Sequence, residues 1–129
     1  VRRGDTLLAQ QLVPMLADDD LGVRMATVRA LGRLGPAAVP AAEELARLLG
    51  DPSADLRAAT AYALGEIGPP ARAARGALLK ARSDPDAAVA FEAQDALGVM
   101  DGRPRVKRPE YEPRATDRCG SAAGSGTRC

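Results

Sequence analysis

Apolar and small residues recur along the chain at helical spacing, and the same pattern appears three times. Residues 18–34 place them three and four positions apart, which forms one face of an α-helix. That face consists of Val23, Ala26, Thr27, Ala30, Leu31 and Leu34. The stretch returns 33 residues later as 51–67 and again as 84–100, where Glu92 takes the place of an alanine. A fixed period of this length is typical of a chain that stacks one unit repeatedly.

A shorter apolar stripe precedes each of these helices and predicts a first helix for each repeat. The stripes are Leu8, Leu12, Met15 and Leu16, then Ala42, Leu45, Leu48 and Leu49, then Ala74, Leu78 and Leu79. Gly35-Pro36 and Gly68-Pro69 separate the repeats, because glycine ends a helix and proline fits the first turn of the next. Pro14 lies inside a first helix and should kink it or delay its start. Ser53 and Asp86 are expected to cap second helices.

The pattern therefore predicts an all-α fold, a right-handed α-solenoid of about three antiparallel helix pairs. The repeats span about residues 5–35, 36–68 and 69–100, and together they form one domain from 5 to 100. Residues 101–129 are rich in Pro, Gly and Arg and poor in aliphatic residues, which predicts a tail that is disordered or extended. Cys119 and Cys129 both lie in this tail; two free thiols are favoured over a disulfide, and the pairing stays open.

Composition narrows the classes of function. The net charge of +1 combines a slightly acidic body, with 11 basic and 13 acidic residues in 1–100, and a basic tail. No apolar run is long enough to span a bilayer, so membrane insertion is not expected and a cytoplasmic location is favoured. The chain begins at Val1, so a removed leader or a longer parent protein stays open.

A longer motif gives the repeats a family resemblance. Asp18, Arg24, Ala30, Leu31, Gly32, Leu34, Gly35 and Pro36 recur in register 33 residues later, from Asp51 to Pro69. The motif closely resembles HEAT repeats, in particular the bacterial-style subtype called PBS-lyase HEAT-like, over residues 5–100. The resemblance implies a polar ladder between neighbouring turns, formed by Asp18, Arg24, Asp51 and Arg57. Repeat 3 keeps Asp84 but has Ala90 in place of the arginine, so the ladder should end there.

The residues for common catalytic and metal sites are missing. The chain has no histidine, which removes Ser-His-Asp and Cys-His arrangements, histidine metal sites and the paired irons of HEAT-like hydroxylases. Asp18-Asp19-Asp20 lacks the spacing of a calcium loop, and Glu43-Glu44 fits a solvated helix face. A net-negative body without Trp argues against HEAT-like DNA glycosylases. We therefore predict no enzyme activity, no cofactor and no metal.

Two surfaces are predicted to contact partners. In a solenoid the second helices line one face, and Met25, Ala58, Tyr62 and Phe91 should form an apolar strip there that docks another protein. Packing of Phe91 and Tyr62 against the neighbouring repeat is the competing interpretation. Arg29, Tyr62 and Asp95 should form an exposed column beside it. In the tail, Arg103, Arg105, Lys107 and Arg108 could lie on acidic protein or on RNA phosphates, or merely keep the tail soluble.

These features predict a non-catalytic protein–protein interaction module, an adaptor or structural subunit of a larger complex that binds through the second helices. Apolar Leu7 and Leu8 at one end of the repeats, and Val99 and Met100 at the other, favour contact with further chain or another subunit. One alternative is an accessory subunit of the phycobilin lyase type, which the resemblance implies. Another is a ribonucleoprotein subunit held by its basic tail.

Overall fold

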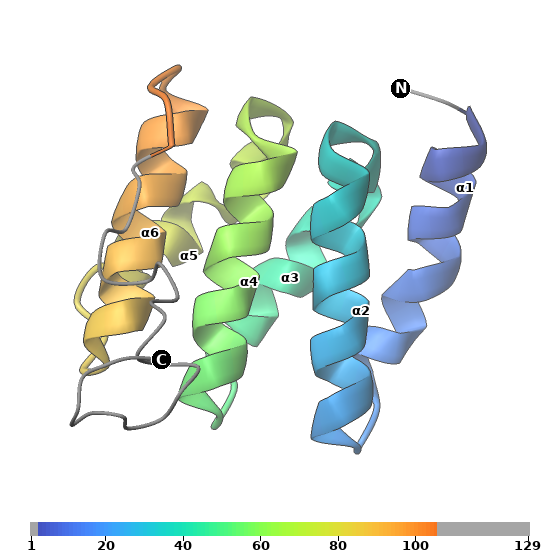
Figure 1. Cartoon of the computed structure of the whole chain (residues 1–129), viewed down its shortest axis with the longest axis horizontal. Helices are drawn as coiled ribbons and strands as arrows, with labels where there is room; N and C mark the ends of the chain where they lie inside the picture. Colours follow the sequence, from blue (N-terminus) through green and yellow to red (C-terminus); the bar gives the residue numbers. More distant parts are fainter. Residues whose placement is uncertain (1–2, 106–129) are drawn as a thin grey trace, which may run out of the picture.

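Two layers of helices stand side by side in the structure, a computed structural model that describes residues 3–105. α1 (Arg3–Leu12), α2 (Leu21–Leu34), α4 (Ala54–Ile67) and α6 (Ala87–Met100) form a row, with α3 (Ala42–Leu48) and α5 (Arg75–Ala81) behind it (Figure 1). Short 3₁₀ helices, η1 (Val13–Ala17), η2 (Gly35–Ala41) and η3 (Pro69–Ala74), complete the first helix of each repeat. The predicted all-α solenoid of helix pairs is confirmed, and α6 ends at Met100, where the apolar pattern stops.

The second helices begin and end where the sequence places their signals. Ser53 Oγ accepts the Leu56 amide at 3.2 Å, and Asp86 Oδ1 accepts the amides of Ala88 and Val89. Gly35 and Gly68 follow α2 and α4 with φ of 61° and 81°, a conformation that glycine adopts without strain. The predicted caps and helix stops are confirmed.

The first helices are irregular because of their prolines. In repeats 2 and 3 a 3₁₀ segment that contains Pro36 and Pro40, or Pro69 and Pro70, leads into a short α-helix. Repeat 1 reverses this order, since α1 runs first and gives way to η1 just before Pro14. The prediction that Pro14 interrupts this helix is confirmed, and the physical reason is its missing amide hydrogen.

The core is aliphatic and lies between the two layers. Its largest fully buried side chains include Leu31, Leu45, Leu56, Leu64, Ile67 and Leu78. The second helices approach one another closely where the Ala-Leu-Gly motif places its glycine. A Cβ on Gly32 would lie 3.3 Å from Ala63 Cβ, and one on Gly65 would lie 3.3 Å from Ala96 Cα. Small residues at these points let α2, α4 and α6 pack as a continuous row whose opposite face is open.

Candidate functional site

Arginines at equivalent positions connect successive repeats at one end of the second helices. Arg57 donates from Nε and Nη2 to both carboxylate oxygens of Asp84, at 2.9 and 3.1 Å, and from Nη1 to the carbonyl of Asp51 at 2.8 Å. Arg24 repeats this arrangement one unit earlier. Its Nη1 donates to the carbonyl of Asp18 at 2.8 Å, and its Nε lies 3.2 Å from Asp51 Oδ1 without the alignment of a hydrogen bond. The contact of Arg24 with Asp51 is therefore electrostatic, whereas Arg57 and Asp84 form a bidentate pair.

The pair that connects repeats 2 and 3, Arg57 with Asp84, is electrostatically the stronger one. The Arg57 hydrogen bond lowers the pKa of Asp84 against an opposing effect of burial, and the Asp86 amide, which donates to the same carboxylate at 2.8 Å, lowers it further. Asp84 in turn raises the pKa of Arg57. Asp18 makes the same turn contact, because its exposed carboxylate accepts the Asp20 amide at 2.8 Å, but among residues 3–105 no arginine forms an ion pair with it. These contacts hold the turns of adjacent repeats together and leave the open face of α2, α4 and α6 to other residues.

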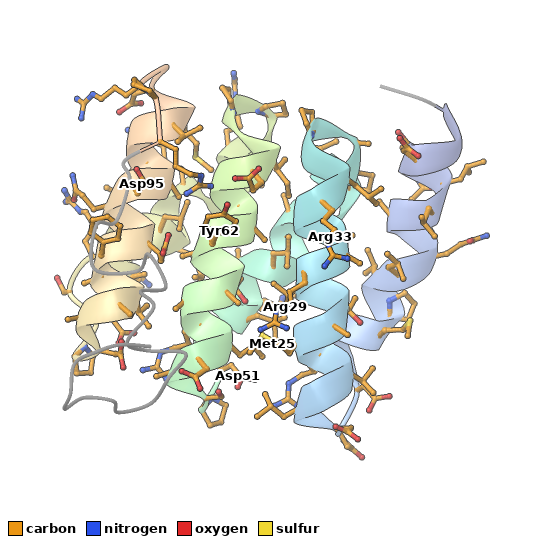
Figure 2. All side chains as sticks on the ribbon, in the orientation of Figure 1. Met25, Arg29, Arg33, Asp51, Tyr62 and Asp95 are labelled. Carbon is orange, nitrogen blue, oxygen red and sulfur yellow. The ribbon has the colours of Figure 1, made fainter. Side chains whose placement is uncertain are left out.

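The predicted apolar strip lies on this open face but is unevenly exposed. Tyr62, in the middle of α4, is 46% exposed, whereas Met25, Ala58 and Phe91 are half-buried. Met25 and Ala58 also pack against the core. Figure 2 shows Met25 and Arg29 beside each other on the edge of α2 toward α4, and Tyr62 on the front of α4. The face thus presents one prominent aromatic ring with partly accessible apolar side chains around it.

The prediction that Arg29, Tyr62 and Asp95 form one exposed column was wrong for Asp95. Arg29 and Tyr62 are exposed, but Asp95 is only 5% exposed, and Glu92 beside it is equally buried. The cause is Arg105, which follows α6 and folds back over it. Helical periodicity places Asp95 on the outer face correctly, but it cannot show that a distant residue covers it.

Arg105 lies between α4 and α6 with all three guanidinium nitrogens engaged. Nη1 donates to Asp95 Oδ2 at 2.7 Å, Nε donates to Glu66 Oε2 at 2.9 Å, and Nη2 donates to the Tyr62 carbonyl at 2.9 Å. Glu92 Oε1 lies 3.9 Å from Nη1, close enough for electrostatic attraction. The guanidinium carbon also lies 4.0 Å from the centre of the Tyr62 ring, which is cation–π geometry. We call this set, Tyr62, Glu66, Glu92 and Asp95, the arginine slot.

The arginine slot also affects the tyrosine hydroxyl. Partial burial raises the pKa of Tyr62, and the nearby Glu66 carboxylate raises it further, while the positive charge of Arg105 opposes both. Tyr62 therefore stays neutral at physiological pH and offers an aromatic ring with a hydroxyl group.

Sequence reasoning missed Glu66, Glu92 and Asp95 as members of a site. One signal was present, because Glu92 replaces an alanine of the repeated apolar face and a lone buried acid requires a partner. Of the four predicted tail contacts, Arg103 is exposed and Arg105 occupies the slot, while Lys107 and Arg108 lie outside the described residues, as do Cys119 and Cys129.

A second candidate surface lies where α1 and η1 meet α2, at the first-repeat end of the row. A cleft of about 490 Å³ is lined there by Leu12, Met15, Asp20, Gly22, Val23, Ala26, Thr27 and Ala30. Leu7 and Leu8 on α1 are 53% and 44% exposed. Ala30 occupies the position in α2 that Ala63 occupies in α4, and Ala63 packs against Gly32 of the preceding repeat. The side of α2 that carries Ala30 therefore has the composition of a contact surface between repeats.

Neither metal ligation nor membrane insertion finds support among residues 3–105. Within that range the acidic side chains form no group of three or more placed to hold a metal ion. None of the helices described is both long and apolar enough to cross a bilayer.

Comparison with known proteins agrees with the geometry. A family model for HEAT repeats matches residues 42–117, more than half of the chain. A search of curated proteins found no match. The first repeat lies entirely before the matched range and carries the same motif from Asp18 to Pro36. With its stacked helix pairs and the family match, the chain belongs to the HEAT-repeat family.

Proposed function

We propose that this protein is an adaptor or structural subunit that binds another protein across the open face of α2, α4 and α6. HEAT repeats generally mediate protein–protein interactions or serve as scaffolds. The observation that carries the proposal is Tyr62, which is 46% exposed at the centre of that face in a chain with only two Tyr, one Phe and no Trp. Exposed aromatic residues of this kind are enriched at the centres of protein interfaces.

The neighbours of Tyr62 support the same proposal. Met25 and Phe91 occupy equivalent positions on the flanking helices and are half-buried, so each can add apolar contact area to a partner. Arg29 and Arg33 are exposed on α2, whereas Glu66 and Asp95 lie on α4 and α6 (Figure 2). The α2 side of the face is therefore basic, which would orient a bound chain, whereas the carboxylates on the other side are paired with Arg105.

Membership of a larger complex is the second part of the proposal. Leu7, Leu8 and Met15 of the first repeat have exposed apolar side chains, and Met15 lines the cleft beside α2. Exposed apolar residues favour a covering partner because their hydration is unfavourable.

The two alternatives remain predictions. No contact among the described residues favours an accessory subunit of the phycobilin lyase type. A ribonucleoprotein role through the tail finds less support, because Arg105 lies against carboxylates of its own chain instead of being free for phosphates.

Site-specific photo-cross-linking tests the proposed face. A photoreactive amino acid would be placed at Tyr62, or at Leu79 on α5 as the matched control, because Leu79 is 42% exposed in the other layer. We expect one partner protein, in stoichiometric amount, cross-linked from position 62 and not from position 79. Equal cross-linking from both positions, or none from position 62, would refute binding through this face.

A further inference from the structure

We propose that the arginine slot between α4 and α6 is a recognition site for an arginine side chain of a partner protein, and that Arg105 occupies it as an intramolecular substitute. This inference rests on the proposed function, because it names the chemistry by which the open face would select its partner. Arginine is the expected occupant because the slot holds the Arg105 side chain in the structure.

The slot fits a guanidinium and not merely a positive charge. Its acceptors, Asp95 Oδ2, Glu66 Oε2 and the Tyr62 carbonyl, lie 2.7, 2.9 and 2.9 Å from three different nitrogens of one planar group. A lysine ammonium is a single point donor and cannot reach three acceptors spread in this way while it also lies over the Tyr62 ring. The slot should therefore discriminate between arginine and lysine.

The backbone of α4 is shaped to admit the guanidinium. Gly65 lies beneath it, and a Cβ at this position would collide with Arg105 Nη2. The acceptors are carried by two helices that pack closely, since a Cβ on Gly65 of α4 would lie 3.3 Å from Ala96 Cα of α6. The spacing between the two sides of the slot is therefore set by the fold before a cation enters, which limits the entropy lost on binding.

The equivalent groove one repeat earlier provides an internal comparison. Between α2 and α4, the positions of Tyr62, Glu66, Glu92 and Asp95 are occupied by Arg29, Arg33, Ala59 and Tyr62. Arg33, Ala59 and Tyr62 replace the three acidic residues, and Arg29 replaces the tyrosine, so that groove would repel a guanidinium. Among the grooves described, the arginine slot alone has this chemistry, and its acids are not a general feature of the repeat.

Because Arg105 belongs to the same chain as the slot, it competes with any partner arginine for binding there. Only five positions separate Arg105 from the end of α6 at Met100, so the local concentration of its side chain is on the order of millimolar. A partner arginine must compete with it, and a partner that contacts Tyr62 and the rest of the face as well would prevail. The intact chain should thus bind isolated arginine side chains only weakly, at a large excess, and bind them tightly only within a larger interface.

Calorimetric titration of the full-length chain tests the proposal. The probe is an acetylated, amidated pentapeptide, Gly-Pro-Arg-Val-Gly, with matched peptides that carry lysine or citrulline in place of arginine. The chain would be used unchanged, as R105A, and as R103A. Arg103 is the matched control because it is exposed and its side chain lies against Gly98, away from the slot carboxylates.

We expect R105A to bind the arginine peptide at least tenfold more tightly than the unchanged chain or R103A, and at least tenfold more tightly than it binds the lysine or citrulline peptides. Adding E66Q and D95N to R105A should abolish this binding while circular dichroism shows the helices intact. If R105A is folded and does not distinguish arginine from citrulline, Arg105 is only a structural strap and the inference is wrong.

A second measurement applies even if R105A does not fold. In the unchanged chain, a large excess of the arginine peptide should displace Arg105 and shift the NMR signals of Tyr62 and Gly65, and the citrulline peptide should not. Absence of these shifts overturns the inference. If adding E66Q and D95N leaves photo-cross-linking from position 62 unchanged, arginine recognition alone is overturned and the proposed face remains in place.

Discussion

Alanine at the glycine of the Ala-Leu-Gly motif should have opposite effects in different repeats. Gly32, Gly65 and Gly98 occupy the same position in three equivalent helices, so each substitution brings a similar gain in helix propensity, up to about 1 kcal/mol in a helix interior. The contacts made by the added methyl group differ among the three positions. The series therefore separates packing between repeats from intrinsic helix preference.

The structure sets the expected order of stability. At Gly98 the nearest atoms are Arg103 Cδ and Cβ at 3.7 and 3.9 Å, an ordinary contact, so G98A should be stabilising by about 0.5 kcal/mol in this last turn. At Gly32 the methyl would lie 3.3 Å from Ala63 Cβ and 3.4 Å from its Cα. Overpacking of this kind costs roughly 1–3 kcal/mol. Because the gain in helix propensity offsets part of this cost, G32A should be destabilised by about 1 kcal/mol in total.

At Gly65 two effects add. The methyl would lie 3.3 Å from Ala96 Cα, as tight a contact as at Gly32, and it would also expel the Arg105 guanidinium from the slot. Because Arg105 is partly solvent-exposed, the loss of its hydrogen bonds adds only about 1 kcal/mol. G65A should thus be destabilised by about 2 kcal/mol, which corresponds to a melting temperature lower by roughly 10 °C for a domain of this size.

Urea unfolding followed by far-ultraviolet circular dichroism would measure the three free energies. The double variant G65A/R105A provides the control, because both changes remove the same contacts and their effects should fall short of additivity by about 1 kcal/mol. If G65A is as stable as G98A, the reasoning about close approach of α4 and α6 is refuted. Full additivity would refute the contact between Gly65 and Arg105.

Three further predictions follow from the ladder and the core. R57A should lower the urea midpoint more than R24A, because Arg57 makes a bidentate pair with Asp84 and Arg24 has no aligned hydrogen bond from its Nε; equal midpoints would contradict this. The pKa of Asp84 is lowered in the folded chain, so its contribution to stability is present above about pH 4 and is lost as the pH falls through the folded-state pKa. The stability difference between the unchanged chain and R57A should therefore narrow below about pH 4 in acid titrations, and a constant difference would exclude this pairing as the cause. L64A should be destabilising by about 3 kcal/mol because Leu64 is fully buried, whereas L79A should change the free energy of unfolding by less than about 0.5 kcal/mol; similar losses would show that the layers are packed differently.

The amino-acid sequence alone determined the fold of this protein, because its information is local and repeated. Helical spacing of apolar residues, Gly35 and Gly68 as stops, and Ser53 and Asp86 as caps each act within a few residues, and the 33-residue period turns one helix pair into a stack. The interruption at Pro14 is local in the same sense, since it arises from a missing amide hydrogen.

Only the tertiary structure decided which residues form the arginine slot. Tyr62 and Glu66 come from one helix, Glu92 and Asp95 from the next, and Arg105 from the segment that follows, 39 residues after Glu66. Periodicity indicated that Asp95 faces outward, yet burial of that carboxylate depends on a guanidinium that helix geometry does not place. The physical reason is that side-chain electrostatics act across space between separate elements, whereas the signals for helices act along the chain.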